Sequence, residues 1–162
     1  MNKFLTILLF TVLVVIPAAL VIAGQCGLFS GQRPSDLGVH HRRLKAPGKN
    51  AQNVVSSQAA MHPHTDYHLI APLTFSGDPA LAFGRLQTII AGTNGTTLVV
   101  SQPEYLHVEF QTTYLKFIDD VEFALDQAKG EIHMRSASRL GRKDFGVNRA
   151  RLEKIRASFD AR

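Results

Sequence analysis

The pattern of hydrophobic and polar positions divides the chain into an apolar N-terminus, an irregular segment and a patterned C-terminal part. Residues 4–23 are uncharged and have no polar face. A run of about 20 apolar residues is long enough to cross a bilayer as a helix. Residues 26–65 are rich in Gly, Pro, Ser, Asn and basic residues without a sustained period, which indicates an irregular basic linker. We therefore expect a signal peptide or transmembrane anchor at 1–25, this linker at 26–65 and a compact domain at 66–162.

Five segments of the C-terminal part follow strand patterns. Residues 104–112, 117–125 and 131–139 alternate between apolar and polar side chains, and residues 96–101 are rich in β-branched residues. Residues 67–73 predict a short edge strand. The alternation is typical of an antiparallel sheet with one buried and one polar face. Gly130 is expected to supply the unusual backbone angle of a hairpin between the last two strands.

Two helices complete the predicted domain. Asp78 and Pro79 begin the first, whose apolar residues recur at helical spacing until Gly92. The second follows Asp144, its expected cap, and has a buried stripe at positions 152, 155 and 159. Together the elements predict an α+β fold, in which an antiparallel sheet of four to five strands carries two helices on one face.

Three fates fit the N-terminal segment: an uncleaved anchor, a cleaved secretory signal or a lipoprotein signal. Residues 21–23 offer a small-residue cleavage site before Gly24. Gln25 precedes Cys26 at a position where lipidation requires a small side chain, and this disfavours a lipoprotein. The first basic residues after the segment conflict with export under the positive-inside tendency; they are Arg33, Arg42, Arg43 and Lys45. We expect a membrane-anchored protein, or one secreted to the periplasm.

Charge and cysteine content narrow the classes of function. Residues 71–131 hold three Lys/Arg and eight Asp/Glu, residues 132–162 hold nine and three, and a separate basic cluster spans 33–49. This polarity differs from the continuous basic stripe of a nucleic-acid-binding protein, so we expect no nucleic-acid partner. Cys26 is the only cysteine, which excludes an intrachain disulfide and a cysteine-based zinc site.

The polar face of the predicted sheet is one candidate site. If the last two strands pair, Asp120 and Glu122 come near His133 and Arg135, because cross-strand neighbours lie about 5 Å apart. An acid/base enzyme, for example a hydrolase, would use the carboxylates and imidazoles of this face: His107, Glu109, Asp120, Glu122 and His133. The alternative interpretation is a solvated face with ordinary salt bridges, each worth about 0–1 kcal/mol.

Asp119 differs from its neighbours because the alternation places it on the inward side of its strand. A buried carboxylate has to be paired or hydrogen-bonded. Its expected partners are Arg135, Arg139 or backbone N–H groups of the following turn. A local bulge that returns Asp119 to solvent is the alternative.

The second candidate is an anion site before the last helix. Arginines, hydroxyl groups and a turn ahead of a helix N-terminus are what such a site requires, and phosphate or a lipid headgroup would fit. The candidate residues are Arg135, Ser138, Arg139, Asn148 and Arg149. In the alternative interpretation, Arg135 and Arg139 form internal salt bridges with the acidic strand.

No catalytic or metal motif stands out. His62, His64, Asp66 and His68 lie close together in the sequence but lack a recognised ligand spacing. A nucleophile elbow, a phosphate-binding loop and a catalytic triad signature are also missing. We therefore assign no catalytic residue, no metal and no cofactor, and favour a protein that is not an enzyme.

Several motifs resemble a known family. Residues 117–123 (FIDDVEF), 135–141 (RSASRLG) and 144–149 (DFGVNR) closely resemble the family called domain of unknown function 1499. Residues 33–38 and 55–58 are similar to its N-terminal motifs, so that the resemblance covers residues 31–159. It implies a bacterial or plastid protein, often exported or membrane-attached, with no established activity.

One departure from the family pattern bears on function. The resemblance implies two cysteines at positions where Ala46 and Val54 stand here, which makes this chain a cysteine-lacking variant. A cysteine-dependent redox or metal function is therefore disfavoured. We expect an envelope protein that contacts the membrane through its N-terminal segment and binds an anionic ligand or another envelope protein without catalysis.

Overall fold

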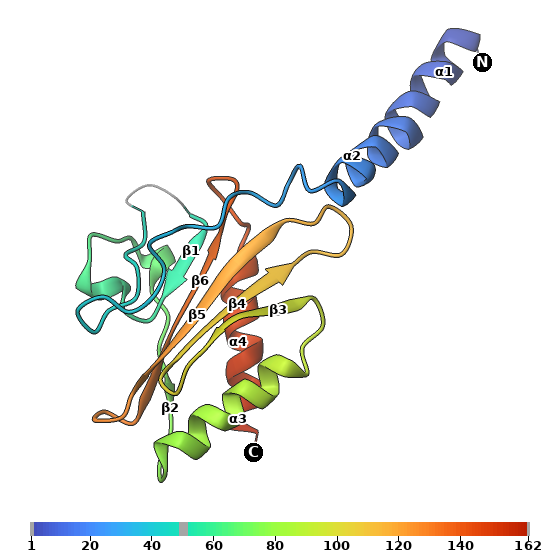
Figure 1. The fold of residues 1–162 in the computed structure, drawn as a ribbon. Coiled ribbons are helices and arrows are strands. Elements are labelled where there is room, and N and C mark those ends of the chain that lie inside the picture. The colour runs from blue at the N-terminus through green and yellow to red at the C-terminus, as the bar shows by residue number, and fades with distance from the viewer. Residues whose placement is uncertain (1, 49–51, 162) are drawn as a thin grey trace.

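The computed structural model describes residues 2–48 and 52–161 (Figure 1). Lys49, which belongs to the basic cluster, lies outside the described residues. The described chain consists of a long N-terminal helix, a segment without regular structure that crosses one sheet face, and an α+β domain (Figure 1). The α+β class expected from the sequence is confirmed.

The N-terminal helix extends over Lys3–Gln25, with a mean hydropathy of 2.9 and no buried part in its most apolar window. It comprises α1 (Lys3–Phe10), a π-helical turn (Thr11–Val15) and α2 (Ile16–Gln25). Pro17 has no N–H group to donate, and a local π adjustment keeps the helix continuous across such a position. The helix is long and apolar enough to cross a membrane, a property shared by signal sequences near an N-terminus.

The described residues form one six-stranded antiparallel sheet with the order β1-β6-β5-β4-β3, in which β2 also pairs with β6. The strands are β1 (Val54–Ser56), β2 (Leu73–Thr74), β3 (Thr96–Ser101), β4 (Tyr105–Gln111), β5 (Ile118–Asp126) and β6 (Glu131–Ser138). The last four match the predicted strands closely. Their alternating patterns are long enough to identify them without tertiary context.

Two short strands share the outer edge of β6, which explains why the sheet has more strands than expected. β1 pairs with β6 through Val54 and Ala137, although it lies within residues 26–65, the segment expected to be an irregular linker. The strand expected at 67–73 is wrong: Asp66–His68 is a 3-10 helix, and β2 begins only at Leu73. Strands of two or three residues contain too few positions to show an alternation.

Helices α3 (Pro79–Ala91) and α4 (Val147–Asp160) pack on one face of the sheet (Figure 1). Asp78 caps α3 as expected, because its carboxylate accepts from Ala80 N at 2.7 Å and Leu81 N at 3.2 Å. The core between this face and the helices is apolar; its fully buried members include Leu86, Leu106, Val108, Val121, Phe123, Ile132, Met134 and Leu152.

Asp144 lies just before α4, and its side chain accepts hydrogen bonds from backbone N–H groups at the start of this helix. The N-cap residue is Gly146, and the Asp144 carboxylate accepts from Gly146 N and Asn148 N, each at 3.0 Å. The Asp144 side chain therefore caps the helix as expected, although Asp144 lies two residues before the N-cap position.

The opposite face of the sheet is covered by residues 31–46, which we call the covering segment. In Figure 1 its blue-to-cyan trace leaves the end of α2 and runs over β5 and β6. At Gly31, where φ is +63°, a Cβ atom would lie 2.8 Å from Cβ of Arg139. A residue with a side chain at position 31 would therefore clash with the sheet.

Candidate functional site

The polar face of the sheet carries a cluster of charged groups on β4, β5 and β6. Antiparallel pairing places His107 opposite Glu122, Glu109 opposite Asp120, and Glu122 opposite Arg135. These positions alternate with the apolar core positions, so the groups point away from α3 and α4. The sheet therefore brings together four of the five residues expected on the polar face and two of the three arginines of the expected anion site, Arg135 and Arg139.

Asp120 is at the centre of one half of this cluster. Its carboxylate lies 2.8 Å from His107 Nε2, and it accepts hydrogen bonds from Arg139 Nε at 2.8 Å and Arg139 Nη2 at 2.7 Å. Arg139 Nη2 also contacts Glu109, which accepts from Arg33 Nε of the covering segment at 2.7 Å. Arg139 is thus held by two carboxylates.

Glu122 is at the centre of the other half. Oε2 accepts from Arg135 Nη1 at 3.0 Å, and Oε1 accepts from the Tyr105 hydroxyl and from Gly38 N, each at 2.8 Å. The bond from Gly38 comes from the covering segment. Glu122 therefore makes a hydrogen bond to each of three different parts of the chain.

Burial distinguishes this cluster from a solvated sheet face. The exposed fraction is 0% for Glu122, 1% for Asp120, 3% for His107 and 4% for Arg135. The interpretation as a set of ordinary surface salt bridges is therefore wrong, because the covering segment excludes water from the face. Internal pairing of Arg135 and Arg139 with the acidic strand, the alternative to an anion site, is what the structure contains.

The ion pairs alter the protonation of the carboxylates. Burial by itself would raise the pKa of Asp120, but hydrogen bonds and charge from Arg139 and His107 outweigh it and lower that pKa to about 2. Burial also opposes, without reversing, the lowering of the Glu109 pKa by Arg139 and Arg33. Both carboxylates are therefore ionised at neutral pH, which suits ion pairing and not the donation of a proton.

His133 lies apart from Asp120. Its partner across the strands is Ala124, and its Nδ1 lies 3.3 Å from the Ser57 hydroxyl. Nε2 lies 3.8 Å from carboxylate oxygens of both Asp126 and Glu131. Burial lowers the His133 pKa more than these carboxylates raise it. The face does not place His133 with His107 as a pair of acid/base groups.

Asp119 is buried on the helix side, as predicted, but its partner is a residue that the sequence did not suggest. Its carboxylate accepts from Arg151 Nη2 of α4 at 2.5 Å. Arg151 also donates to Asn148 Oδ1 at 2.8 Å and to the Ser136 hydroxyl at 2.9 Å. The expected partners Arg135 and Arg139 lie on the opposite side of the sheet, since β6 alternates as well.

The five residues expected to bind an anion do not share a cavity. Asn148 is fully buried and donates to Asn53 O at 2.9 Å and to the Ser138 hydroxyl at 3.0 Å. Arg149 donates to the carbonyls of Tyr67 at 2.8 Å and Leu69 at 2.7 Å. Arg135 and Arg139 belong to the charged cluster on the other face.

The histidines at positions 62, 64 and 68 do not converge either. Thr65 N donates to His68 Nδ1 at 2.9 Å, and His64 Nδ1 lies 2.7 Å from His62 O. Among the residues described, no group of three or more His, Cys, Asp or Glu side chains is arranged to hold a metal ion.

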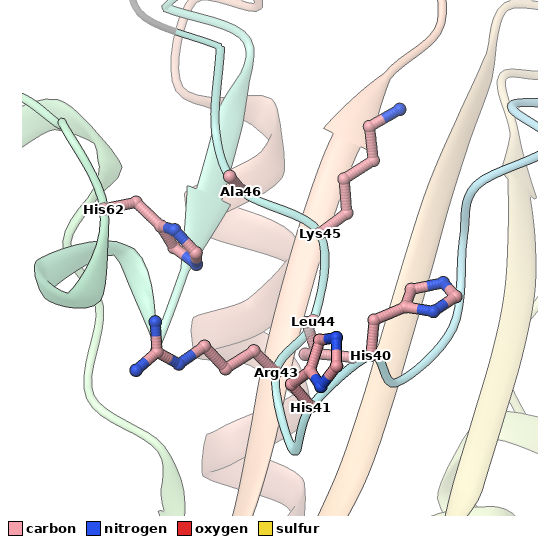
Figure 2. A pocket seen from close by; sticks show the side chains of 7 residues that line it. All are labelled: His40, His41, Arg43, Leu44, Lys45, Ala46 and His62. Atoms are coloured by element: carbon pink, nitrogen blue, oxygen red, sulfur yellow. The ribbon is translucent and has the colours of Figure 1, made fainter.

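Sequence reasoning missed a pocket at the outer side of the covering segment. It has a volume of about 510 Å³ and is lined by His40, His41, Arg43, Leu44, Lys45, Ala46 and His62 (Figure 2). Apart from His62, these residues belong to the basic cluster at 33–49, which we expected within the irregular linker at 26–65. The run of His, Arg and Lys at 40–45 was the available signal.

The comparison with protein families agrees with the motifs. A model described as "Protein of unknown function (DUF1499)" matches residues 44–159, which is more than half of the chain. The match includes β1, so the family domain begins before residue 66. A search of the curated proteins finds no match. The chain therefore belongs to the DUF1499 family of proteins of unknown function.

Proposed function

We propose that this protein is a membrane-anchored, non-catalytic module of the bacterial cell envelope that binds an anionic partner. The apolar helix Lys3–Gln25 supports the anchor, because its side chains at 4–10 and 12–20 are exposed and do not pack against the domain. Its end contacts the domain, where Gln25 Nε2 donates to Tyr114 O at 3.1 Å. The domain is then held close to the membrane surface.

The closed charge network on the polar face is the observation that carries the non-catalytic assignment. An acid/base enzyme needs titratable groups that reach a substrate. Here Asp120 and Glu122 are each held by an arginine, and the covering segment contacts Glu109 and Glu122 directly. Catalysis on this face would require the covering segment to leave and at least one buried ion pair to open.

The cations that remain after internal pairing support an anionic partner. Within the described residues, the side chains of Arg42, Arg43, Arg142 and Lys143 form no ion pair, and all four residues are exposed. The chain has a net charge of +5. Exposed, unpaired cations attract anionic groups over a Debye length of about 8 Å at physiological ionic strength.

Thermal unfolding of the full chain in micelles of a neutral detergent tests this function. The additives are inorganic phosphate, citrate and vesicles that contain phosphatidylglycerol, each compared with chloride at equal ionic strength and with phosphatidylcholine vesicles. An anion that binds the folded state at about 100 times its Kd stabilises it by roughly 2.7 kcal/mol. If no anion raises the unfolding midpoint above its control, the anion-binding function is wrong.

A further inference from the structure

We propose that the pocket between residues 40–46 and His62 binds the phosphate group of a ligand. This inference rests on the proposed function and assigns the anion to a defined site. The site is distinct from the set Arg135, Ser138, Arg139, Asn148 and Arg149. It lies on the outer side of the covering segment, between the His40–Arg43 turn and the residues that follow β1 (Figure 2).

The turn that forms one wall has an unusual backbone for its residues. His40 N donates to Arg43 O at 2.8 Å, and Arg43 N donates to His40 O at 3.0 Å. The two residues between them, His41 and Arg42, have φ values of 52° and 63°. This is the geometry of a two-residue type I′ turn, which strongly favours Asn-Gly. A side chain other than that of glycine is strained in this region.

Backbone strain of this kind persists only where the surrounding structure enforces it, and such strain is frequent at binding sites. The enforcing contacts come from Gln58, which follows β1. Its Oε1 accepts from Leu44 N at 2.8 Å, and its Nε2 donates to Arg42 O at 3.2 Å. Leu44 is only 2% exposed. The turn is therefore held in place, and its side chains are presented by a fixed backbone.

The side chains that line the pocket are mostly basic. Four of the seven are His or Arg, one is Lys, and none is a carboxylate. Lys45 is neutralised by Asp36, with 2.5 Å between Nζ and Oδ1, and Figure 2 shows it pointing away from the other basic groups. The guanidinium of Arg43 forms no ion pair or hydrogen bond within the described residues, and it extends toward His62 in Figure 2.

His62 supplies a separate indication of a missing ligand. Its Nε2 atom is buried and has no hydrogen-bond partner among the described residues. A buried polar atom without a partner is unfavourable, because it has lost its hydrogen bonds to water. An oxygen atom of a ligand held by Arg43 would provide that partner when Nε2 carries the proton.

These groups fit a phosphate better than other anions. The planar guanidinium of arginine binds two phosphate oxygens at once, and neighbouring imidazoles donate to the others. Leu44 and Ala46 line the same pocket and provide an apolar wall for the carbon atoms of a phosphate ester. Inorganic phosphate, a small phosphomonoester and a phospholipid headgroup share this chemistry.

Isothermal titration of the full chain in neutral-detergent micelles tests the site, with inorganic phosphate and glycerol phosphate as probes. Arg43→Gln should weaken both Kd values about ten- to hundred-fold, because a hydrogen bond to a charged group contributes about 1.5–3 kcal/mol. His41→Gly should also weaken binding without lowering the unfolding midpoint, since glycine relieves the strain of the turn. Arg142→Gln removes an exposed arginine outside the pocket and should leave Kd within about two-fold.

The outcomes separate the site from the function. If phosphate binds the wild type but Arg43→Gln binds equally well, or if only Arg142→Gln loses affinity, the pocket is the wrong site and the anion-binding function stands. If the wild type binds neither phosphate compound nor phosphatidylglycerol vesicles, both proposals fail. Vesicle binding that free phosphate does not reduce, and that Arg43→Gln retains, places the lipid contact outside this pocket and also overturns the assignment.

Discussion

The two faces of the sheet are buried by opposite means. Helices α3 and α4 cover one face, where Leu86 of α3 and Leu152 of α4 share an apolar core with strand residues such as Phe123. The covering segment, which has no regular secondary structure apart from an isolated bridge between His40 and Arg43, covers the other face, where Asp120, Glu122 and Arg135 are almost completely buried. The same three strands, β4, β5 and β6, supply both layers.

This difference determines how each face responds to change. An apolar contact contributes in proportion to the area that it buries, so the loss of one side chain has a graded effect. An ion pair in a water-free layer depends on both partners, because a single remaining charge is strongly unfavourable there. We therefore expect the polar face to be the less tolerant one, although it is the face that resembles a ligand platform in the sequence.

The largest expected effect comes from Arg139→Met. This change leaves Asp120 buried without its strongest partner and removes one of two cations from Glu109. The loss of one partner of a buried ion pair typically destabilises a protein by about 3–5 kcal/mol. Urea unfolding of the full chain in neutral-detergent micelles, followed by circular dichroism, measures the loss.

The matched control is Arg142→Met, because Arg142 is exposed and forms no ion pair within the described residues. We expect its free energy of unfolding to change by less than about 0.5 kcal/mol. Equal effects of the two substitutions would show that the polar face is not a closed layer.

On the helix-covered face, Leu86→Ala should destabilise the protein by about 2–4 kcal/mol. Leu86 of α3 is fully buried in the core, and its truncation leaves a cavity. Salt distinguishes an apolar contribution from a charged one. The Leu86→Ala difference should be the same in 0.05 M and 0.5 M NaCl, and a strong dependence on salt would indicate that charge also contributes to this face.

Acid should weaken the polar face before the apolar one. The pKa of Asp120 is lowered to about 2, so its contribution is present above the unfolded pKa near 3.8 and is lost as the pH falls through 2. At 1.36 kcal/mol per pKa unit, this contribution is roughly 2 kcal/mol. Unfolding free energies between pH 5 and pH 2 should fall less steeply for Asp120→Asn than for the wild type. Parallel curves would contradict the assignment.

The smallest effect is expected outside both layers, at the exposed turn of the covering segment. His41→Gly should stabilise the protein by about 0.5–1 kcal/mol, because His41 has a φ of 52°. The gain is limited by the greater freedom of glycine in the unfolded chain. His64→Gly, at an exposed position with a negative φ, is the control and should not stabilise the protein. Thermal unfolding of the two variants in parallel measures the difference.

The sequence was sufficient for the elements whose patterns are long. Alternation over β4, β5 and β6 identified their inward and outward positions, including the unusual inward position of Asp119. It did not identify Arg151 as the partner, because that contact depends on how α4 docks on the sheet. Local periodicity contains no information on the rotation of a helix against a neighbouring strand.

The covering segment was the main feature that the sequence did not indicate. Alternation distinguishes an apolar from a polar face, but a polar face looks the same whether water or another segment covers it. Arg33 pairs with Glu109 and Gly38 donates to Glu122, and such isolated contacts produce no period in the sequence. The pocket lined by Arg43 and His62 combines residues on two sides of β1 and was therefore also missed.

A double-mutant cycle on Glu122 and Arg135 tests most directly whether the polar face is a closed structural layer. Unfolding free energies are needed for the wild type, Glu122→Gln, Arg135→Met and the double variant. Each single change should destabilise the protein by about 3–5 kcal/mol, and the double variant should be destabilised by clearly less than their sum. Single changes of less than about 1 kcal/mol that add up in the double variant are typical of an exposed pair and would contradict the account.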